Sequence, residues 1–253
     1  MSRPLATRLF VDASLAAGAQ VTLGESHAHQ LRSVLRLGEG DDIALFNGRD
    51  GEWRARLAVL GKRTVTAVLD DQLRPQAAEP DVWLLFAPIK GPRLDWIVEK
   101  AAELGASAIV PVLTRRTVVS RINLERLRAH AVEAAEQCER LTVPPVSAAR
   151  SLEDVIAEWP AGRHLYVAAE RRGVPPMATM IRADGAPAAI LIGPEGGFEP
   201  AELDRLAQLG FASLVGLGPR ILRADTAAAA AMALWQALAQ PPLANRPGRA
   251  HIA

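Results

Sequence analysis

The residues with the clearest chemical potential form a glycine-rich segment, Gly193-Pro194-Glu195-Gly196-Gly197, which follows an apolar run and precedes a helical pattern. Glycines at the carboxyl end of a strand let a ligand approach the backbone closely, and α/β sheets bind ligands in such crevices. The segment matches neither the phosphate-binding loop GxxxxGK[ST] nor the dinucleotide pattern GxGxxG. It therefore disfavours nucleoside triphosphates and nicotinamide cofactors, and a plain structural turn stays an equally open interpretation.

A second glycine-rich turn, Gly216 to Pro219, leads through Arg220 and Arg223 into an alanine-rich helix pattern. We expect one of these arginines to point into the crevice made by the first glycine segment. A solvated pair of arginines is the alternative. Asp225 is predicted to cap the helix, a role that requires no catalytic function.

Basic residues follow two further apolar runs. Lys90 and Arg93 follow the first, and Arg115 and Arg116 follow the second. The net charge is only +1, but residues 90–150 carry an excess of three positive charges, and 26 of the 29 basic residues are arginine. A neutral protein can still present basic faces, and the guanidinium group suits phosphate. The pattern favours phosphate contacts over part of the surface, with a solvated face or compositional bias as the alternative.

Several classes of site are excluded or disfavoured. The five histidines are scattered, and no Ser/His/Asp order, GxSxG elbow or HExxH helix accompanies them. Cys138 is the single cysteine, which fits a reducing, cytoplasmic environment and offers no metal-binding cluster. No apolar stretch is long enough to span a membrane. We therefore expect a cytoplasmic protein without metal or membrane contact.

The hydrophobic patterns that must position these residues change along the chain. Short strands are predicted at 8–12, 42–46, 53–60 and 64–69, with one helix that Ser26 caps, and residues 71–81 are predicted as a linker. Apolar runs at 82–86, 108–112, 164–168, 188–192 and 213–217 then alternate with helical patterns, including a short helix that Ser151 caps. The expected fold is a small β-barrel over 1–72 and an α/β domain with a mostly parallel sheet over 73–253.

Five segments taken together resemble a known family. They are HQLRSVLRLGEGD, KGPRLDWIVEKAAELGASAIVPVLTRR, EAAEQCERLTVPPV, LIGPEGGFEPAEL and LGPRILRADTAAAAA. In this order they resemble the 16S ribosomal RNA (uracil(1498)-N(3))-methyltransferase family of the knotted SPOUT superfamily, over about residues 8–238. The resemblance implies a PUA-like, RNA-binding barrel and a trefoil-knot domain that binds S-adenosylmethionine. It also implies a homodimer that acts on 16S rRNA of the small ribosomal subunit.

The resemblance also implies the residues of a cofactor site. The glycine segment, the second glycine-rich turn and the end of the strand at 164–168 would form its walls. By motif these residues are Ala169, Ile192, Gly193, Pro194, Gly196, Gly197, Leu217, Gly218, Ile221, Leu222, Arg223 and Thr226. The family usually has Glu where this chain has Asp225, which favours a capping role for this shorter carboxylate.

The reaction suggests roles for two charged residues. Uracil N3 carries a proton and lies on the pairing edge, so the base must be unpaired and its anion stabilised. We assign Arg223 as the cation that stabilises the anion and Glu195 as a candidate proton acceptor. RNA contacts are expected from seven basic residues, of which Arg32 and Arg36 lie one helical turn apart: Arg8, Arg32, Arg36, Lys90, Arg93, Arg115 and Arg116.

Three other functions stay open at this point. The chain could be a non-catalytic RNA-binding module that keeps the knot as a scaffold. It could be a related knotted methyltransferase that acts on another rRNA base or on tRNA. It could also methylate a small molecule, although arginines on both sides of the glycine segments favour a phosphate-bearing substrate.

Overall fold

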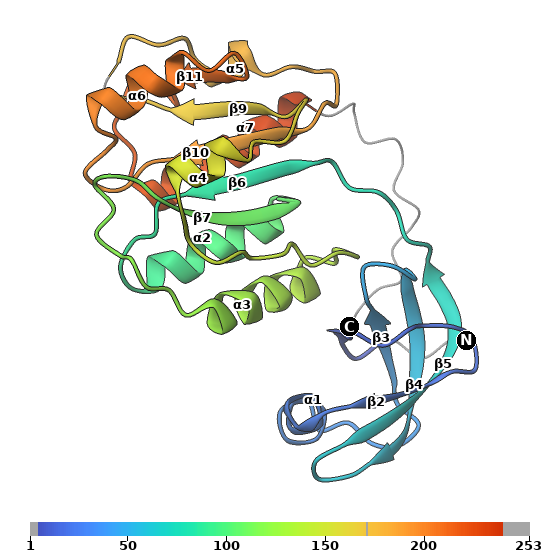
Figure 1. Ribbon diagram of the computed structural model, residues 1–253. Coiled ribbons are helices and arrows are strands. Elements are labelled where there is room, and N and C mark those ends of the chain that lie inside the picture. Colours follow the sequence, from blue (N-terminus) through green and yellow to red (C-terminus); the bar gives the residue numbers. More distant parts are fainter. Residues whose placement is uncertain (1–4, 171, 240–253) are drawn as a thin grey trace. The chain divides into compact units, whose positions relative to one another are not determined.

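The computed structural model describes residues 5–170 and 172–239, and its internal contacts divide the chain into two units (Figure 1). Among the described residues, the first unit includes 5–78 together with Ala135–Val143, and the second includes Glu79–Ala134, 144–170 and 172–239. The boundary predicted after residue 72 falls inside a strand of the first unit. The division into 1–72 and 73–253 stays a prediction.

The first unit is built on a five-stranded sheet with the order β1-β3-β4-β5-β2. β1 pairs with β3 in parallel, and the remaining neighbours are antiparallel. Alternate residues of these strands, such as Leu9, Ile43 and Leu57, enter one apolar core that excludes water. The elements are β1 (Arg8–Phe10), β2 (Gln20–Leu23), α1 (Glu25–His29), the π-helix η1 (Gln30–Val34), β3 (Asp42–Phe46), β4 (Glu52–Leu60) and β5 (Val65–Arg74).

Three details of this unit differ from the predictions. β2 has too few apolar residues to be recognised from its sequence. The predicted cap Ser26 lies inside α1, whose N-cap is Gly24. β5 continues to Arg74 through residues predicted as linker, because it pairs with β4 as far as Glu52 and because Arg74 forms an ion pair with that buried carboxylate at 2.6 Å.

The second unit contains a six-stranded sheet in which every pairing is parallel, with the order β11-β9-β10-β6-β7-β8. The strands predicted at 82–86, 164–168 and 188–192 are observed with those bounds. The strands are β6 (Val82–Phe86), β7 (Ala108–Leu113), β8 (Arg150–Ser151), β9 (His164–Ala168), β10 (Ala188–Ile192) and β11 (Ala212–Val215). The helices are α2 (Pro92–Glu103), α3 (Leu124–Gln137), α4 (Leu152–Ala157), α5 (Met177–Met180), α6 (Pro200–Ala207) and α7 (Ala224–Ala239).

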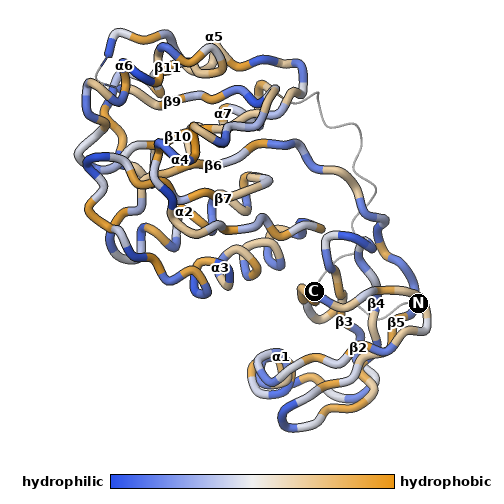
Figure 2. The backbone as a smooth tube through the Cα atoms, viewed as in Figure 1, coloured by the Kyte–Doolittle hydropathy of each residue, from blue (hydrophilic) through white to orange (hydrophobic). Residues whose placement is uncertain are grey.

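The central strands are buried on both faces, which explains their continuous apolar sequences. Leu165, Val167 and Leu191 enter a cluster with residues of α4 and α6. The intervening residues are buried as well, and α7 contacts β6 and β10 and packs beside α2. In contrast to these strands, α3 alternates between hydrophilic and hydrophobic residues along its length, as expected for a helix with one solvated face (Figure 2). In the described part of the chain, no helix is both long and apolar enough to cross a membrane.

Two helix starts test the capping predictions. Ser151 accepts a hydrogen bond from the backbone N–H of Asp154 and caps α4, as predicted. The prediction for α7 was wrong by two residues. The backbone N–H of Ala227 donates to the carbonyl of Arg223, and the helix begins at Ala224. Asp225 therefore lies in the first turn, where its carboxylate interacts favourably with the helix dipole.

Candidate active site

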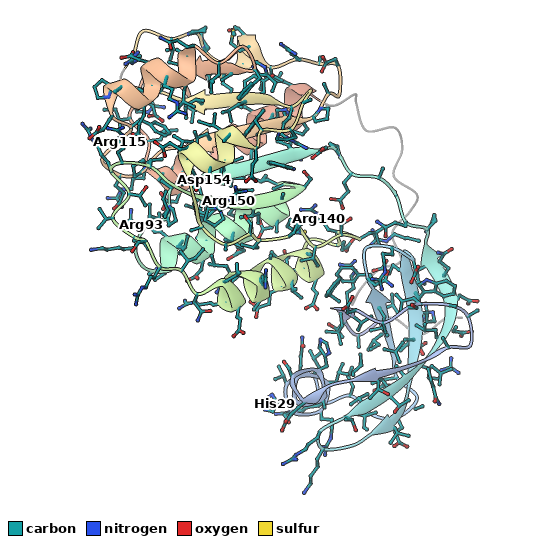
Figure 3. The ribbon with its side chains drawn as sticks, viewed as in Figure 1. His29, Arg93, Arg115, Arg140, Arg150 and Asp154 are labelled. Atoms are coloured by element: carbon teal, nitrogen blue, oxygen red, sulfur yellow. The ribbon has the colours of Figure 1, made fainter. Side chains whose placement is uncertain are left out.

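The carboxyl ends of β9, β10 and β11 are followed by three segments that enclose a cavity of about 420 Å³. This volume is within the range of small-molecule sites, about 300–1,000 Å³. Arg93, in the first turn of α2, also lines the cavity, and the first turn of α7 forms another side of it. Figure 3 labels Arg93 and Arg115, which follow β6 and β7 at the same edge of the sheet. The cavity thus occupies the position where parallel sheets bind ligands.

Gly193 is required by close packing at the base of the cavity. A Cβ atom at this position would lie 2.7 Å from Cε2 of Phe198, whose side chain is buried with Leu191 and Leu203. Gly197 lines the same cavity with a φ of 71°, and its N–H donates to the Pro194 carbonyl. The glycine segment is therefore a tight, packed turn that brings backbone directly to the cavity wall.

Glu202 holds this turn against the loop that follows β7. One carboxylate oxygen accepts the backbone N–H of Arg115 at 2.8 Å, and the other accepts the backbone N–H of Glu199 at 2.9 Å. The second bond belongs to the capping box of α6. Arg116 adds a hydrogen bond to the Gly196 carbonyl at 3.2 Å. The loop after β7 and the glycine segment consequently form one connected structure.

Four charged side chains line the cavity. Arg93 and Glu195 form an ion pair with an N–O distance of 2.6 Å, while Glu170 lies at the end of β9. Arg223 is exposed and makes no ion pair or hydrogen bond through its side chain with any residue that the structure describes. The cavity thus combines a neutralised pair with the carboxylate of Glu170 and with the guanidinium group of Arg223, which is available to an anionic ligand.

The structure brings most of the residues predicted for the cofactor to this cavity. Those that line it are Ala169, Ile192, Gly193, Pro194, Gly197, Ile221, Leu222 and Arg223. Glu195 lines it too, whereas Gly196, Leu217, Gly218 and Thr226 are not among the lining residues. The sequence reasoning missed Phe198, Leu203, Ala224 and Ala227. The spacing of three between the last two was a usable signal, because it places both on one face of α7.

Arg8 requires a correction. It was expected to contact RNA, but only 4% of its surface is exposed. Its guanidinium forms an ion pair with Glu52, stacks over Phe46 and donates to the carbonyls of Ala135 and Arg140. These interactions satisfy the charge inside the first unit, so Arg8 has a structural role there.

The other basic residues predicted to contact RNA differ in their surroundings. Arg32 and Arg36 are exposed, but Arg36 lies beyond η1 with a φ of 55°, so the expected regular helical spacing between them is absent. Arg115 and Arg116 are exposed and lie 3.7 and 3.9 Å from carboxylate oxygens of Glu199. Arg93 belongs to the cavity itself. RNA contact by these residues stays a prediction.

Comparison with known proteins identifies the family. Residues 77–236 match the RNA methyltransferase domain family, and residues 28–70 match the RNA methyltransferase PUA domain. This chain belongs to the RNA methyltransferase family. A relative in Rickettsia conorii, ribosomal RNA small subunit methyltransferase E, is 33% identical over 89% of this chain and 93% of its own. The protein of that name in Synechocystis is 36% identical over 92% of this chain and 78% of its own.

Solved structures of family members share the fold. A ribosomal RNA small subunit methyltransferase E of Neisseria gonorrhoeae, bound to S-adenosyl methionine, has a TM-score of 0.84 and 30% identity. It covers 92% of this chain and 97% of its own. A methyltransferase of Legionella pneumophila in complex with the same cofactor has a TM-score of 0.85 and 27% identity, and covers 94% and 99%. These findings confirm the predicted fold class: a PUA-like N-terminal domain and an α/β SPOUT methyltransferase domain with a mostly parallel sheet.

Proposed function

We propose that the protein transfers a methyl group from S-adenosylmethionine to N3 of uridine 1498 in the 16S rRNA of the small ribosomal subunit. The observation that carries this proposal is the cavity at the ends of β9, β10 and β11, within a chain of the RNA methyltransferase family. Relatives named for small-subunit rRNA methylation cover most of the chain, which supports the substrate class. We also infer a cytoplasmic location, because the proposed substrate is ribosomal RNA.

The cavity fits S-adenosylmethionine in size and in chemistry. Ile192, Leu222 and Ala227 offer apolar contacts to the adenosine, and the backbone of Gly193 and Gly197 allows close approach. Glu170 is available to the polar and cationic groups of the ligand, whereas Glu195 is paired with Arg93. When bound, this cofactor supplies an electrophilic methyl group on a positively charged sulfur.

The residues of the chain then have to activate uracil N3. Arg223 is the cavity cation with no partner among the described residues, so it is placed to stabilise the negative charge that develops on the base. Glu195 is the carboxylate that receives the N3 proton, and Arg93 orients it through the 2.6 Å ion pair.

The methyltransferase also acts as a homodimer in this proposal. α7 supports this because its exposed face carries Leu238, of which 40% is accessible, while Ala227, Ala228 and Ala231 are buried inside the unit. The mass of the purified chain in solution, measured by sedimentation equilibrium, tests this part: a mass near 54 kDa is expected from the 27.0 kDa chain, and about 27 kDa would contradict it.

Mass mapping of 16S rRNA tests the reaction and its position. Deletion of the gene should remove one methyl group from the fragment that contains uridine 1498, and the wild-type gene should restore it. A variant with Arg223→Gln should bind RNA but fail to restore the modification. An unmodified fragment in the wild-type strain, or a methyl group lost elsewhere, would contradict the proposed substrate.

A further inference from the structure

A second cleft of about 360 Å³ lies in the second unit, apart from the cavity described above. It is formed by Ile89–Gly91 after β6, the first turn of α2, and the segment from Val119 into the start of α3. It shares no lining residue with the first cavity. The two helices that border it both begin on the side of the unit where β6 ends (Figure 1).

The cleft carries positive charge that the described structure does not neutralise. Lys90 and Arg121 are exposed, and neither side chain has an ion pair or hydrogen bond with a described residue. Asp95 is the single acidic residue of the described lining, and it is already engaged. Its carboxylate lies 2.6 Å from Arg126, and His130 lies 3.5 Å from its other oxygen. Lys90 and Arg121 therefore leave the cleft with a net charge of about +2.

The cleft differs from the nearby basic residues because those residues already have acidic partners. Arg93, Arg115 and Arg116 all lie within 4.0 Å of a carboxylate oxygen, so an incoming anion must compete for them. Lys90 and Arg121 need no such exchange. The start of α2 adds partial positive charge, because its Gly91 N-cap has no side chain to satisfy the helix end, whereas the Asn123 side chain already accepts the backbone N–H of Arg126 at the start of α3.

The chemistry of the lining favours a phosphate over a base. None of the described lining residues is aromatic, so the cleft offers no platform for base stacking. It offers an ammonium group and a guanidinium group, which are usual partners of phosphate oxygens.

We propose that this cleft binds a backbone phosphate of the RNA substrate, at a nucleotide next to the one that enters the cavity. The proposal rests on the proposed function, because it takes the substrate to be RNA. Lys90 and Arg121 hold the phosphate from two sides and fix the register of the strand while the neighbouring base is turned outward. The contact is sequence-independent and depends on salt.

The salt dependence of RNA binding tests the cleft. A fluorescent single-stranded fragment of 16S rRNA that contains the target uridine is titrated with the full-length protein between 50 and 300 mM salt. The Lys90→Gln/Arg121→Gln variant should weaken binding at every salt concentration. It should also reduce the slope of log K against log salt by about 0.7, because the cleft holds one phosphate and each single-strand phosphate contact contributes about 0.7.

Arg205→Gln is the matched control. Arg205 is exposed on α6 of the same unit and lines neither cavity, so its removal changes the charge without touching the cleft. It should leave the slope within about 0.3 of the wild type. Binding of S-adenosylmethionine, measured by calorimetry, should be equal in the wild type, the control and the double variant, which shows that the fold is intact.

A second titration with inorganic phosphate separates an RNA phosphate from a free anion. The proposal predicts a reduced RNA slope in the double variant and phosphate binding that is weak in every protein. An RNA slope that is unchanged in the double variant would overturn the proposal. If, in addition, the wild type binds inorganic phosphate tightly and the double variant does not, the cleft is a site for a free anion instead. If the wild-type protein methylates no rRNA but the double variant still reduces the RNA slope, the proposed function is refuted and phosphate binding by the cleft is supported. If the wild-type protein methylates uridine 1498 but the double variant leaves the RNA slope unchanged, the proposed function is supported and phosphate binding by the cleft is refuted.

Discussion

Replacement of Gly193 by alanine is the perturbation whose effect follows most directly from the structure. The added Cβ would lie 2.7 Å from Cε2 of Phe198, and ordinary contact begins at 3.4 Å, so one of the two groups must move by about 0.7 Å. The Phe198 ring is 8% exposed and packs against Leu191 and Leu203, so it has little space for retreat. The main chain of the glycine segment must therefore take up much of the movement.

Two measurements should register this strain. Overpacking of a well-packed site costs about 1–3 kcal/mol, which lowers the melting temperature of a domain of this size by about 2–12 °C. Displacement of the segment should also weaken the binding of S-adenosylmethionine by about tenfold, since a loss of about 1.4 kcal/mol in binding free energy corresponds to a factor of ten in Kd. Differential scanning calorimetry reports the first effect and isothermal titration calorimetry reports the second.

Gly216→Ala is the control for this variant. Gly216 also follows a strand, but its Cβ would meet Val174 at an ordinary 3.6 Å. The double variant Gly193→Ala/Phe198→Leu removes the ring atom that causes the overlap and should recover part of the stability in a double-mutant cycle. If Gly193→Ala matches Gly216→Ala in melting temperature and in cofactor affinity, the packing explanation of this glycine is refuted.

Three further predictions concern single charged or titratable groups. Arg223→Gln should reduce the single-turnover methylation rate by about 10²–10³ at saturating cofactor, as loss of one stabilising donor does, and a wild-type rate would exclude the assigned role. Glu52→Gln should cost about 3–5 kcal/mol in urea unfolding because it leaves the buried Arg8 without its counter-ion, whereas Asp12→Asn at an exposed pair should change stability by less than about 0.5 kcal/mol; equal effects would contradict this. Burial, with a further contribution from Arg182, holds the pKa of His164 below its ordinary value of 6.5. The unfolded chain therefore binds the extra proton first, and the stability that this histidine contributes is complete above about pH 6.5 and is lost as the pH falls below that value. The melting temperature of His164→Gln should fall less between pH 8 and pH 5 than that of the wild type, and parallel curves would show that His164 is not responsible.

The sequence by itself determined the fold class and pointed to the segments that line the candidate active site. The apolar runs at 82–86, 164–168 and 188–192 are continuous because parallel strands are buried on both faces, and that property is visible in any single sequence. The glycine segment after β10 could also be recognised from the local sequence alone. A strand end followed by glycines limits what the backbone can do, whatever the rest of the molecule contains.

Only the tertiary structure decided how the charged residues are used. Arg8 looked like an exposed cation near the start of the chain, but residues from β4 and from 135–143 surround it. The sequence did not show that Arg93 has an acidic partner, but the sheet order places β6 beside β10 and so brings Arg93 to Glu195. Lys90 and Arg121 came together in the same way, from segments about 30 positions apart. The physical reason is that electrostatic interactions depend on distance in space and on burial, and in a parallel sheet both are set by which strands are neighbours.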